Sequence, residues 1–162
     1  MLPNAVYKRK NKYIIRILQG GSDMVKLELY SVRDGIVQEK AGLNWGFSDG
    51  HVCIDDAYVA ITHAFIKKYP TFFPTTGEID VIWDDNTEMR CSVEGTQCVN
   101  DKTYSKQLTS ADDKSVFGSY IRKRMGIPSG TKIEMKDLDK YGRRDIDVEK
   151  IGNNMYRIDF SV

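Results

Sequence analysis

The stretch EIDVIWDDNTEMRCSV, residues 78–93, contains the clearest structural signal in the sequence. Six apolar residues alternate with polar ones on either side of its centre: Ile79, Val81, Trp83, Met89, Cys91 and Val93. Such alternation is typical of strands that bury one face. The centre, Asp84-Asp85-Asn86, has residues that favour tight turns. The stretch therefore predicts an antiparallel hairpin with its apolar face toward a core.

The flanking sequence predicts further short strands. Runs of β-branched or alternating residues occupy 12–18, 24–30, 56–61, 131–138, 145–151 and 154–162. Turn residues separate several of them, at 20–23, 34–35 and 152–154. Many short strands at regular spacing favour a small barrel or sandwich over an architecture of alternating strands and helices.

Two short helices are expected beside these strands. One covers 62–69 and ends before Pro70, followed by Phe72 and Phe73 as core residues. The other covers 112–126, with Asp112 or Asp113 as N-terminal cap and Gly126 at its end. Its buried stripe is predicted to consist of Val116, Phe117, Tyr120 and Ile121.

Length and composition indicate a single globular domain. The chain has 162 residues, of which 41% are hydrophobic and 29% charged, too apolar a composition for disorder. We expect no membrane partner, because no stretch of about 18 apolar residues and no signal peptide occur. Cys53, Cys91 and Cys98 lack CxxC spacing, which favours free thiols in a reducing cytoplasm.

The net charge of +1 conceals an uneven distribution along the chain. Residues 1–40 carry a net +4, residues 41–95 a net −6, residues 96–144 a net +5 and residues 145–162 a net −2. A basic face is therefore compatible with a nearly neutral protein. Folding could equally interleave these segments and leave no patch.

Two long polar segments, 31–55 and 94–113, interrupt the strand pattern and are candidate functional loops. They are rich in amides, lysines and aromatic residues: Asn44, Trp45, Phe47, Ser48, Asp49 and His51 in the first, and Gln97, Asn100, Lys102, Tyr104, Ser105, Lys106 and Gln107 in the second. Asn and Gln can pair with adenine, and Lys with guanine, in the major groove of DNA. The alternatives are that Trp45 anchors its loop as a core residue and that the lysines are simply solvated.

A compact magnesium-dependent endonuclease is the alternative function. Glu134-Met135-Lys136 and Asp112-Asp113-Lys114 have the spacing of acid and lysine found around catalytic Mg²⁺, although a charged sequence produces such triplets by chance. No GxSxG, P-loop or GxGxxG motif occurs. We expect no catalytic residue, no metal site and no cofactor for binding, and Mg²⁺ only under the alternative.

Five blocks of sequence, taken in order, resemble a known family. They cover 37–46 (VQEKAGLNWG), 56–61, 72–91, 114–126 and 141–161. From about residue 24 to its end the chain is similar to the C-terminal DNA-recognition domain of NgoFVII-type restriction endonucleases. The resemblance implies a B3-like domain over 24–162, preceded by an extension, 1–23, that includes the strand at 12–18.

The resemblance also implies an architecture and a mode of binding. The fold would be a mainly-β, seven-stranded open pseudobarrel with two short helices. Two arms, containing the two polar segments, would enter the major groove of double-stranded DNA and read its sequence, with the residues named above, except Lys106, as base contacts. Phosphate contacts would come from Lys40, Lys106, Lys114, Ser115, Arg143 and Arg144. The chain would serve target recognition in the cytoplasm of a prokaryote, with a nuclease domain or subunit as partner.

One segment departs from the family pattern. Where the family continues GLNWG (42–46) with a segment rich in Asn and Arg, this chain has FSDGHVCIDD (47–56), which is acidic and has no arginine. The departure implies a different target or a modified base, and Phe47 could pack on a base methyl group.

Overall fold

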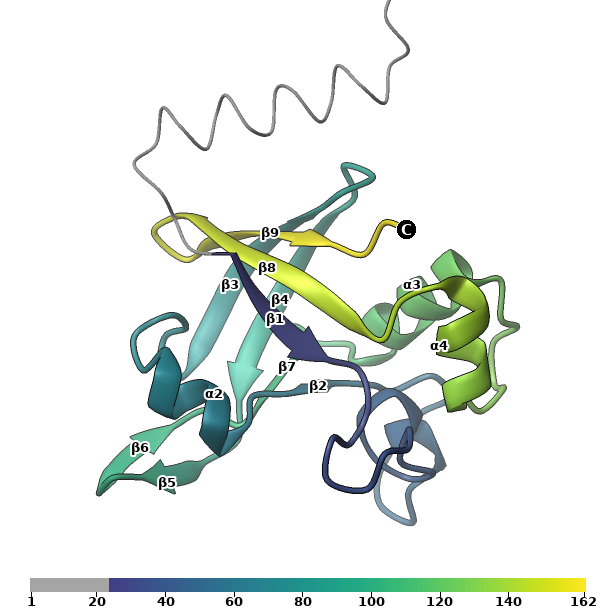
Figure 1. The fold of residues 1–162 in the computed structure, drawn as a ribbon, viewed down its shortest axis with the longest axis horizontal. Helices are drawn as coiled ribbons and strands as arrows, with labels where there is room; N and C mark the ends of the chain where they lie inside the picture. The colour runs from purple at the N-terminus through teal and green to yellow at the C-terminus, as the bar shows by residue number, and fades with distance from the viewer. Residues whose placement is uncertain (1–23) are drawn as a thin grey trace, which may run out of the picture.

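The computed structural model describes residues 24–162, which form a strongly curved β-sheet with helices beside it (Figure 1). The elements are β1 (Met24–Glu28), η1 (Gly42–Phe47), β2 (Val59–Ala60), α2 (His63–Lys68), β3 (Gly77–Trp83), β4 (Glu88–Glu94), β5 (Gln97–Val99), β6 (Lys102–Tyr104), β7 (Gln107–Ser110), α3 (Ser115–Met125), α4 (Met135–Tyr141), β8 (Asp145–Gly152) and β9 (Met155–Asp159).

Seven strands form the main sheet in the order β1-β8-β9-β3-β4-β7-β2, and β5 and β6 form a separate hairpin. Neighbouring strands are antiparallel except for β3 and β9, which are parallel. The edge strands β1 and β2 approach each other, so the sheet is nearly closed. The expected mainly-β, seven-stranded open pseudobarrel is confirmed.

The hairpin predicted over 78–93 is formed by β3 and β4 and supplies much of the core. Ile79 lies opposite Cys91, and Val81 lies opposite Met89. All six apolar residues of the predicted alternation are buried. Trp83 packs on the ring of Tyr120 with centroids 4.3 Å apart, which joins the sheet to α3.

Helix α3 begins and ends close to the predicted residues, but its buried face differs. Asp113 accepts hydrogen bonds from the backbone N–H and the hydroxyl of Ser115, and Gly126 closes the helix with φ of 70°. Val116, expected in the buried stripe, is 46% exposed. Arg122 is buried instead, because its guanidinium pairs with the buried carboxylate of Asp55.

The prediction of a strand over 131–138 was wrong, and with it the count of two helices. Residues 135–141 form α4, a third α-helix. Glu134 and Asp137 form a reciprocal capping box, and Leu138 is buried. The alternating pattern of 131–135 concealed this helix start, although the acid three residues after Glu134 is a start signal.

The remaining strand predictions differ mainly in length. Strand β1 ends at Glu28, β9 ends at Asp159, and only Val59–Ala60 of the predicted 56–61 strand pairs with a neighbour. The predicted helix after Thr62 is α2, with the Thr62 hydroxyl accepting from the Phe65 N–H. The strand expected at 12–18 and the turn at 20–23 lie outside the described residues.

Candidate nucleic-acid interface

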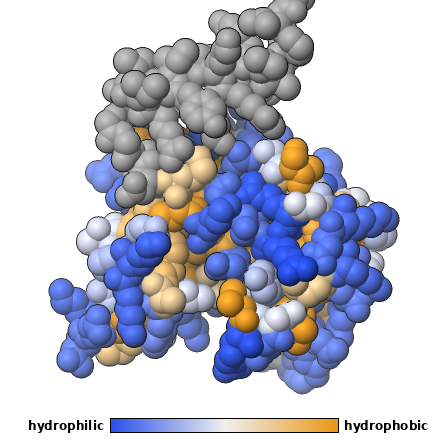
Figure 2. Space-filling model, viewed as in Figure 1, coloured by the Kyte–Doolittle hydropathy of each residue, from blue (hydrophilic) through white to orange (hydrophobic). Residues whose placement is uncertain are grey.

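Two segments project from the same end of the barrel, on either side of β2 (Figure 1). The N-arm, residues 31–55, connects β1 toward β2 and contains η1. The C-arm, residues 95–106, connects β4 to β7 and contains the β5–β6 hairpin. Figure 2 shows both as separate projections with a mainly hydrophilic surface. The second polar segment is therefore a hairpin followed by a strand of the main sheet, rather than a loop over 94–113.

Asn44 fastens the N-arm to the body of the protein. Its amide nitrogen donates to the carbonyl oxygens of Gln38 and Ile133 at 2.9 and 2.8 Å, and its amide oxygen accepts from the Ile133 N–H at 2.8 Å. The residue is 1% exposed. Because its donors are occupied and its side chain is buried, the expectation that Asn44 is presented to bases was wrong.

A buried ion pair holds the other end of the N-arm. Asp55 lies 3.2 Å from Arg122 of α3 and accepts from the Gly130 N–H at 2.8 Å. Burial opposes ionisation, but hydrogen bonds from Ser129 and Gly130 and the charge of Arg122 hold the pKa of Asp55 below its usual range. A Cβ at Gly118 would lie 1.8 Å from the Asp55 carbonyl oxygen, so only glycine allows this contact.

The two aromatic residues of the N-arm lie under lysines. Trp45 is half-buried and meets Tyr58 edge to face at 5.3 Å, with the Lys114 ammonium 5.2 Å from its ring centre. Phe47 lies 5.3 Å from the Lys132 ammonium. Trp45 therefore anchors the arm, as the alternative interpretation of this residue expected.

The outer part of the N-arm remains accessible. Asp49 and His51 are exposed, and Ser48 is half-buried. Lys40 forms an exposed ion pair with Asp49 at 3.0 Å. These four side chains can meet a ligand without any rearrangement of the core.

One face of the C-arm packs on the body. The Gln97 amide nitrogen donates to the carbonyl oxygens of Ile61 and Ser105, both at 2.7 Å. Tyr104 packs against the hydrophobic core, and Ser105 is buried. These three predicted base contacts hold the hairpin in place, and of them only Ser105 is buried.

The opposite face and the tip of the C-arm are exposed. Cys98 pairs with Thr103 across the two strands, and both are exposed. Asn100 and Asp101 form the tip with φ of 51° and 63°, as a tight two-residue hairpin turn requires. Sequence reasoning missed Cys98 and Thr103, because it treated this segment as a loop and did not apply the two-residue period of a strand.

A polar group, which we name the root cluster, lies where the two arms leave the body. It consists of Trp45, Ser92, Glu94, Gln107 and Lys114. Glu94 forms an ion pair with Lys114, and each side chain is 31% exposed. Gln107 donates to one Glu94 oxygen at 2.9 Å and Ser92 donates to the other at 3.2 Å. The predicted base contact Gln107 and phosphate contact Lys114 are thus engaged within the protein.

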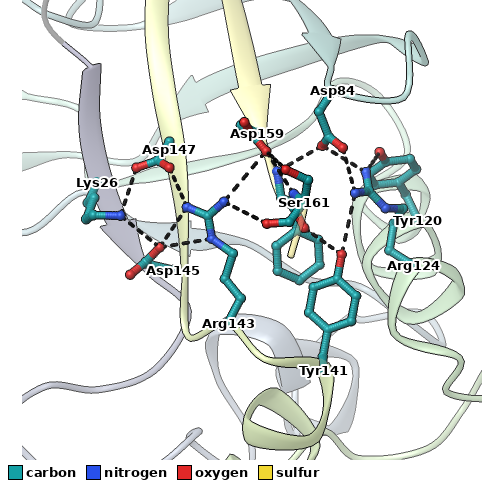
Figure 3. A network of polar contacts seen from close by, with 11 residues as sticks. Lys26, Asp84, Tyr120, Arg124, Tyr141, Arg143, Asp145, Asp147, Asp159 and Ser161 are labelled. Atoms are coloured by element: carbon teal, nitrogen blue, oxygen red, sulfur yellow. Dashed lines mark hydrogen bonds and ion pairs between the residues drawn. The ribbon is translucent and has the colours of Figure 1, made fainter. Parts of the chain in front are cut away.

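Arg143 lies in a different network, which joins β8 to the C-terminal end of the chain (Figure 3). Its guanidinium is within 2.9 Å of Asp145 and 2.6 Å of Asp147, and it donates to the Ser161 carbonyl oxygen at 3.2 Å. Its side chain is only 12% exposed. The predicted role in phosphate binding was wrong, because Arg143 ties the C-terminal strand to β8.

Two more of the six predicted phosphate contacts, Arg144 and Ser115, also have internal partners. Arg144 is exposed but pairs with Asp139 at 2.5 Å and lies over the ring of Tyr30. The Ser115 hydroxyl donates to Asp113 at 2.6 Å. Neither lies on the N-arm or the C-arm.

Four lysines at the C-arm are unpaired. Lys67 and Lys68 belong to α2, which packs beside the hairpin, and Lys102 and Lys106 belong to the arm itself. All four are exposed and form no ion pair within residues 24–162. Sequence reasoning missed Lys67 and Lys68, since only the fold brings α2 next to the second polar segment.

The two acid-lysine triplets do not come together with further acids. Lys136 pairs with Glu134 at 2.7 Å on the surface of α4. Across residues 24–162, no group of three or more His, Cys, Asp or Glu side chains is arranged to hold a metal ion.

No helix in the same range is long and apolar enough to cross a membrane.

Comparison with protein families gives one match. The family described as the NgoFVII C-terminal B3-like DNA-binding domain matches residues 17–152. The matched range begins seven residues before the expected domain of 24–162 and ends ten residues before its end. It contains both arms and the root cluster. No individually curated protein matches the chain.

Proposed function

The chain belongs to the family of NgoFVII C-terminal B3-like DNA-binding domains, and from this membership we propose that it reads double-stranded DNA through its N-arm and C-arm. The resemblance drawn from the five sequence blocks is thereby confirmed. The observation that carries the proposal is the position of two anchored arms at one end of the barrel (Figure 1). Because the arms are already held in place by the body of the protein, little conformational entropy is lost when they bind a ligand.

Both arms would enter the major groove from one side of the duplex. This groove is about 12 Å wide and admits a two-stranded β-ribbon. The β5–β6 hairpin is such a ribbon, and its exposed face and tip carry polar side chains. The anchors Asn44 and Gln97 would keep the spacing between the arms fixed during binding.

Base contacts would come from the accessible residues of each arm. On the N-arm these are Ser48, Asp49 and His51, and on the C-arm Asn100 and Lys102. A carboxylate can accept from the cytosine amino group, an amide can pair with adenine, and a lysine can donate to guanine. The acidic N-arm therefore favours cytosine in the part of the DNA target that it contacts.

Phosphate contacts would come from the lysines around the C-arm. Lys67, Lys68 and Lys106 are exposed and free of ion pairs among residues 24–162. On the N-arm, Lys40 would exchange Asp49 for a phosphate. Phosphate contacts supply affinity and register, whereas base contacts supply the preference for sequence.

Recognition of a modified base forms part of the proposal. Phe47 is half-exposed beside the acidic tip of the N-arm, and an aromatic ring offers an apolar surface for a base methyl group. The protein would then be the target-recognition module of a restriction system in the cytoplasm, with a nuclease domain or subunit as its partner.

Selection of duplexes from a randomised pool tests this function, with one pool methylated at cytosine and one unmethylated. We expect enrichment of one short sequence, and affinity that falls steeply with salt. An unenriched pool together with salt-independent binding would refute the proposed function. Equal enrichment in both pools would refute only the sensitivity to methylation.

A further inference from the structure

We propose that Glu94 is a specificity-determining residue that neutralises Lys114, so that the surface between the arms does not attract phosphate irrespective of sequence. This inference rests on the proposed function. It concerns the root cluster, which belongs neither to the tips of the arms nor to the lysines around the C-arm.

Lys114 lies beside the roots of both arms. Its ammonium lies 5.2 Å from the ring centre of Trp45 in the N-arm. Its ion-pair partner Glu94 ends β4 and directly precedes the C-arm. A duplex held by both arms would approach this surface, because the arms project from the same end of the barrel (Figure 1).

Glu94 is fixed as an acceptor by donors on three separate segments. Gln107 of β7 and Ser92 of β4 bind its two oxygens, and Lys114 before α3 pairs with it. Burial opposes ionisation, but the hydrogen bonds from Lys114 and Gln107 hold the pKa of Glu94 below its usual range. The carboxylate is therefore charged at neutral pH and offsets the lysine. Lys102 and Lys106 have no such partner within residues 24–162.

Neutralising Lys114 lowers the affinity for DNA of every sequence by the same term. Every cation that meets a phosphate releases counterions, and this term supplies essentially all of non-specific affinity. Specificity is a difference between affinities for two targets. A surface without net charge between the arms lowers binding to non-target DNA, so that the base contacts of the arms decide which duplex is retained.

Glu94→Gln tests the inference, since the amide oxygen can still accept the hydrogen bond from Gln107 while the negative charge that offsets Lys114 is removed. We expect tighter binding of a random duplex and a log–log salt slope steeper by about 0.9. The advantage of the variant over wild type should then shrink about 3.5-fold between 50 and 200 mM salt. Glu134→Gln is the matched control, because it releases Lys136 from an exposed pair on α4 and should leave the slope unchanged.

Lys114→Ala gives a second, independent result. Alone it should leave the salt slope unchanged, and combined with Glu94→Gln it should restore the wild-type slope. A flatter slope for Lys114→Ala alone would make Lys114 a phosphate contact and overturn the inference. An unchanged slope for Glu94→Gln, or an equal change for Glu134→Gln, would overturn it as well.

Two further outcomes separate the inference from its premise. If wild type binds no duplex, the proposed function fails and the inference with it. If wild type binds and only the slopes disagree, the inference alone is overturned. Should thermal melting show that Glu94→Gln does not fold, the slope of Lys114→Ala decides the matter.

Discussion

Replacing Asn44 with alanine should destabilise the whole domain, rather than relax the preference for one base. Asn44→Ala removes three hydrogen bonds: a partly buried one to Gln38 within the N-arm, and two buried ones that join the N-arm to Ile133. Each contributes about 0.5–1.5 kcal/mol, so the free energy of unfolding should fall by about 2–4 kcal/mol. For a domain of this size, that corresponds to a fall in Tm of roughly 5–15 °C.

Urea unfolding followed by circular dichroism measures this change. Gln38→Ala is the matched control, because the Gln38 side chain is exposed and its loss should alter the free energy of unfolding by less than about 0.5 kcal/mol. A similarly small effect for Asn44→Ala, with loss of preference at a single base position, would refute the assignment of Asn44 as an anchor.

Other substitutions should act on binding and on stability in different ways. Lys67→Ala or Lys106→Ala should weaken binding to every duplex and flatten the log–log salt slope by about 0.9, as measured by fluorescence anisotropy; an unchanged slope would remove that lysine from the interface. Gln97→Ala should lower affinity for all sequences, since it loosens the C-arm from Ile61, and a loss confined to one base position would contradict this. Because the pKa of Asp55 is lowered in the folded state, the free energy of unfolding should fall as the pH drops below about 4. That slope should be weaker in Asp55→Asn, and equal slopes in acid titrations would argue against the buried pair.

The sequence predicted the body of the domain better than its binding surface. Alternation is a strong signal where one face is buried, and the β3–β4 hairpin was predicted residue by residue. The start of α4 was not predicted, because the residues just before it alternate as in a strand. Arg122 was not expected in the buried stripe of α3, because its buried partner Asp55 lies far away in the sequence.

The predicted site residues differ in how available they are to a ligand, for a single physical reason. Composition identifies side chains able to contact DNA, but it does not show which of them are already bonded within the protein. Asn44, Gln97 and Lys114 have the right chemistry and are used as anchors or neutralised. Only the fold distinguishes them from Asn100 and Lys102, which lie on exposed parts of the C-arm.

The native cysteines offer a direct test that both arms meet one duplex. Cys53 is exposed on the N-arm and Cys98 on the C-arm, whereas Cys91 is buried in β4. Burial raises the pKa of Cys91 to about 12, so it should resist alkylation and serve as an internal control. We predict that a duplex carrying the selected sequence slows alkylation of Cys53 and Cys98 together, as followed by peptide mass spectrometry. Protection of one arm alone, or of neither, would contradict two-armed recognition.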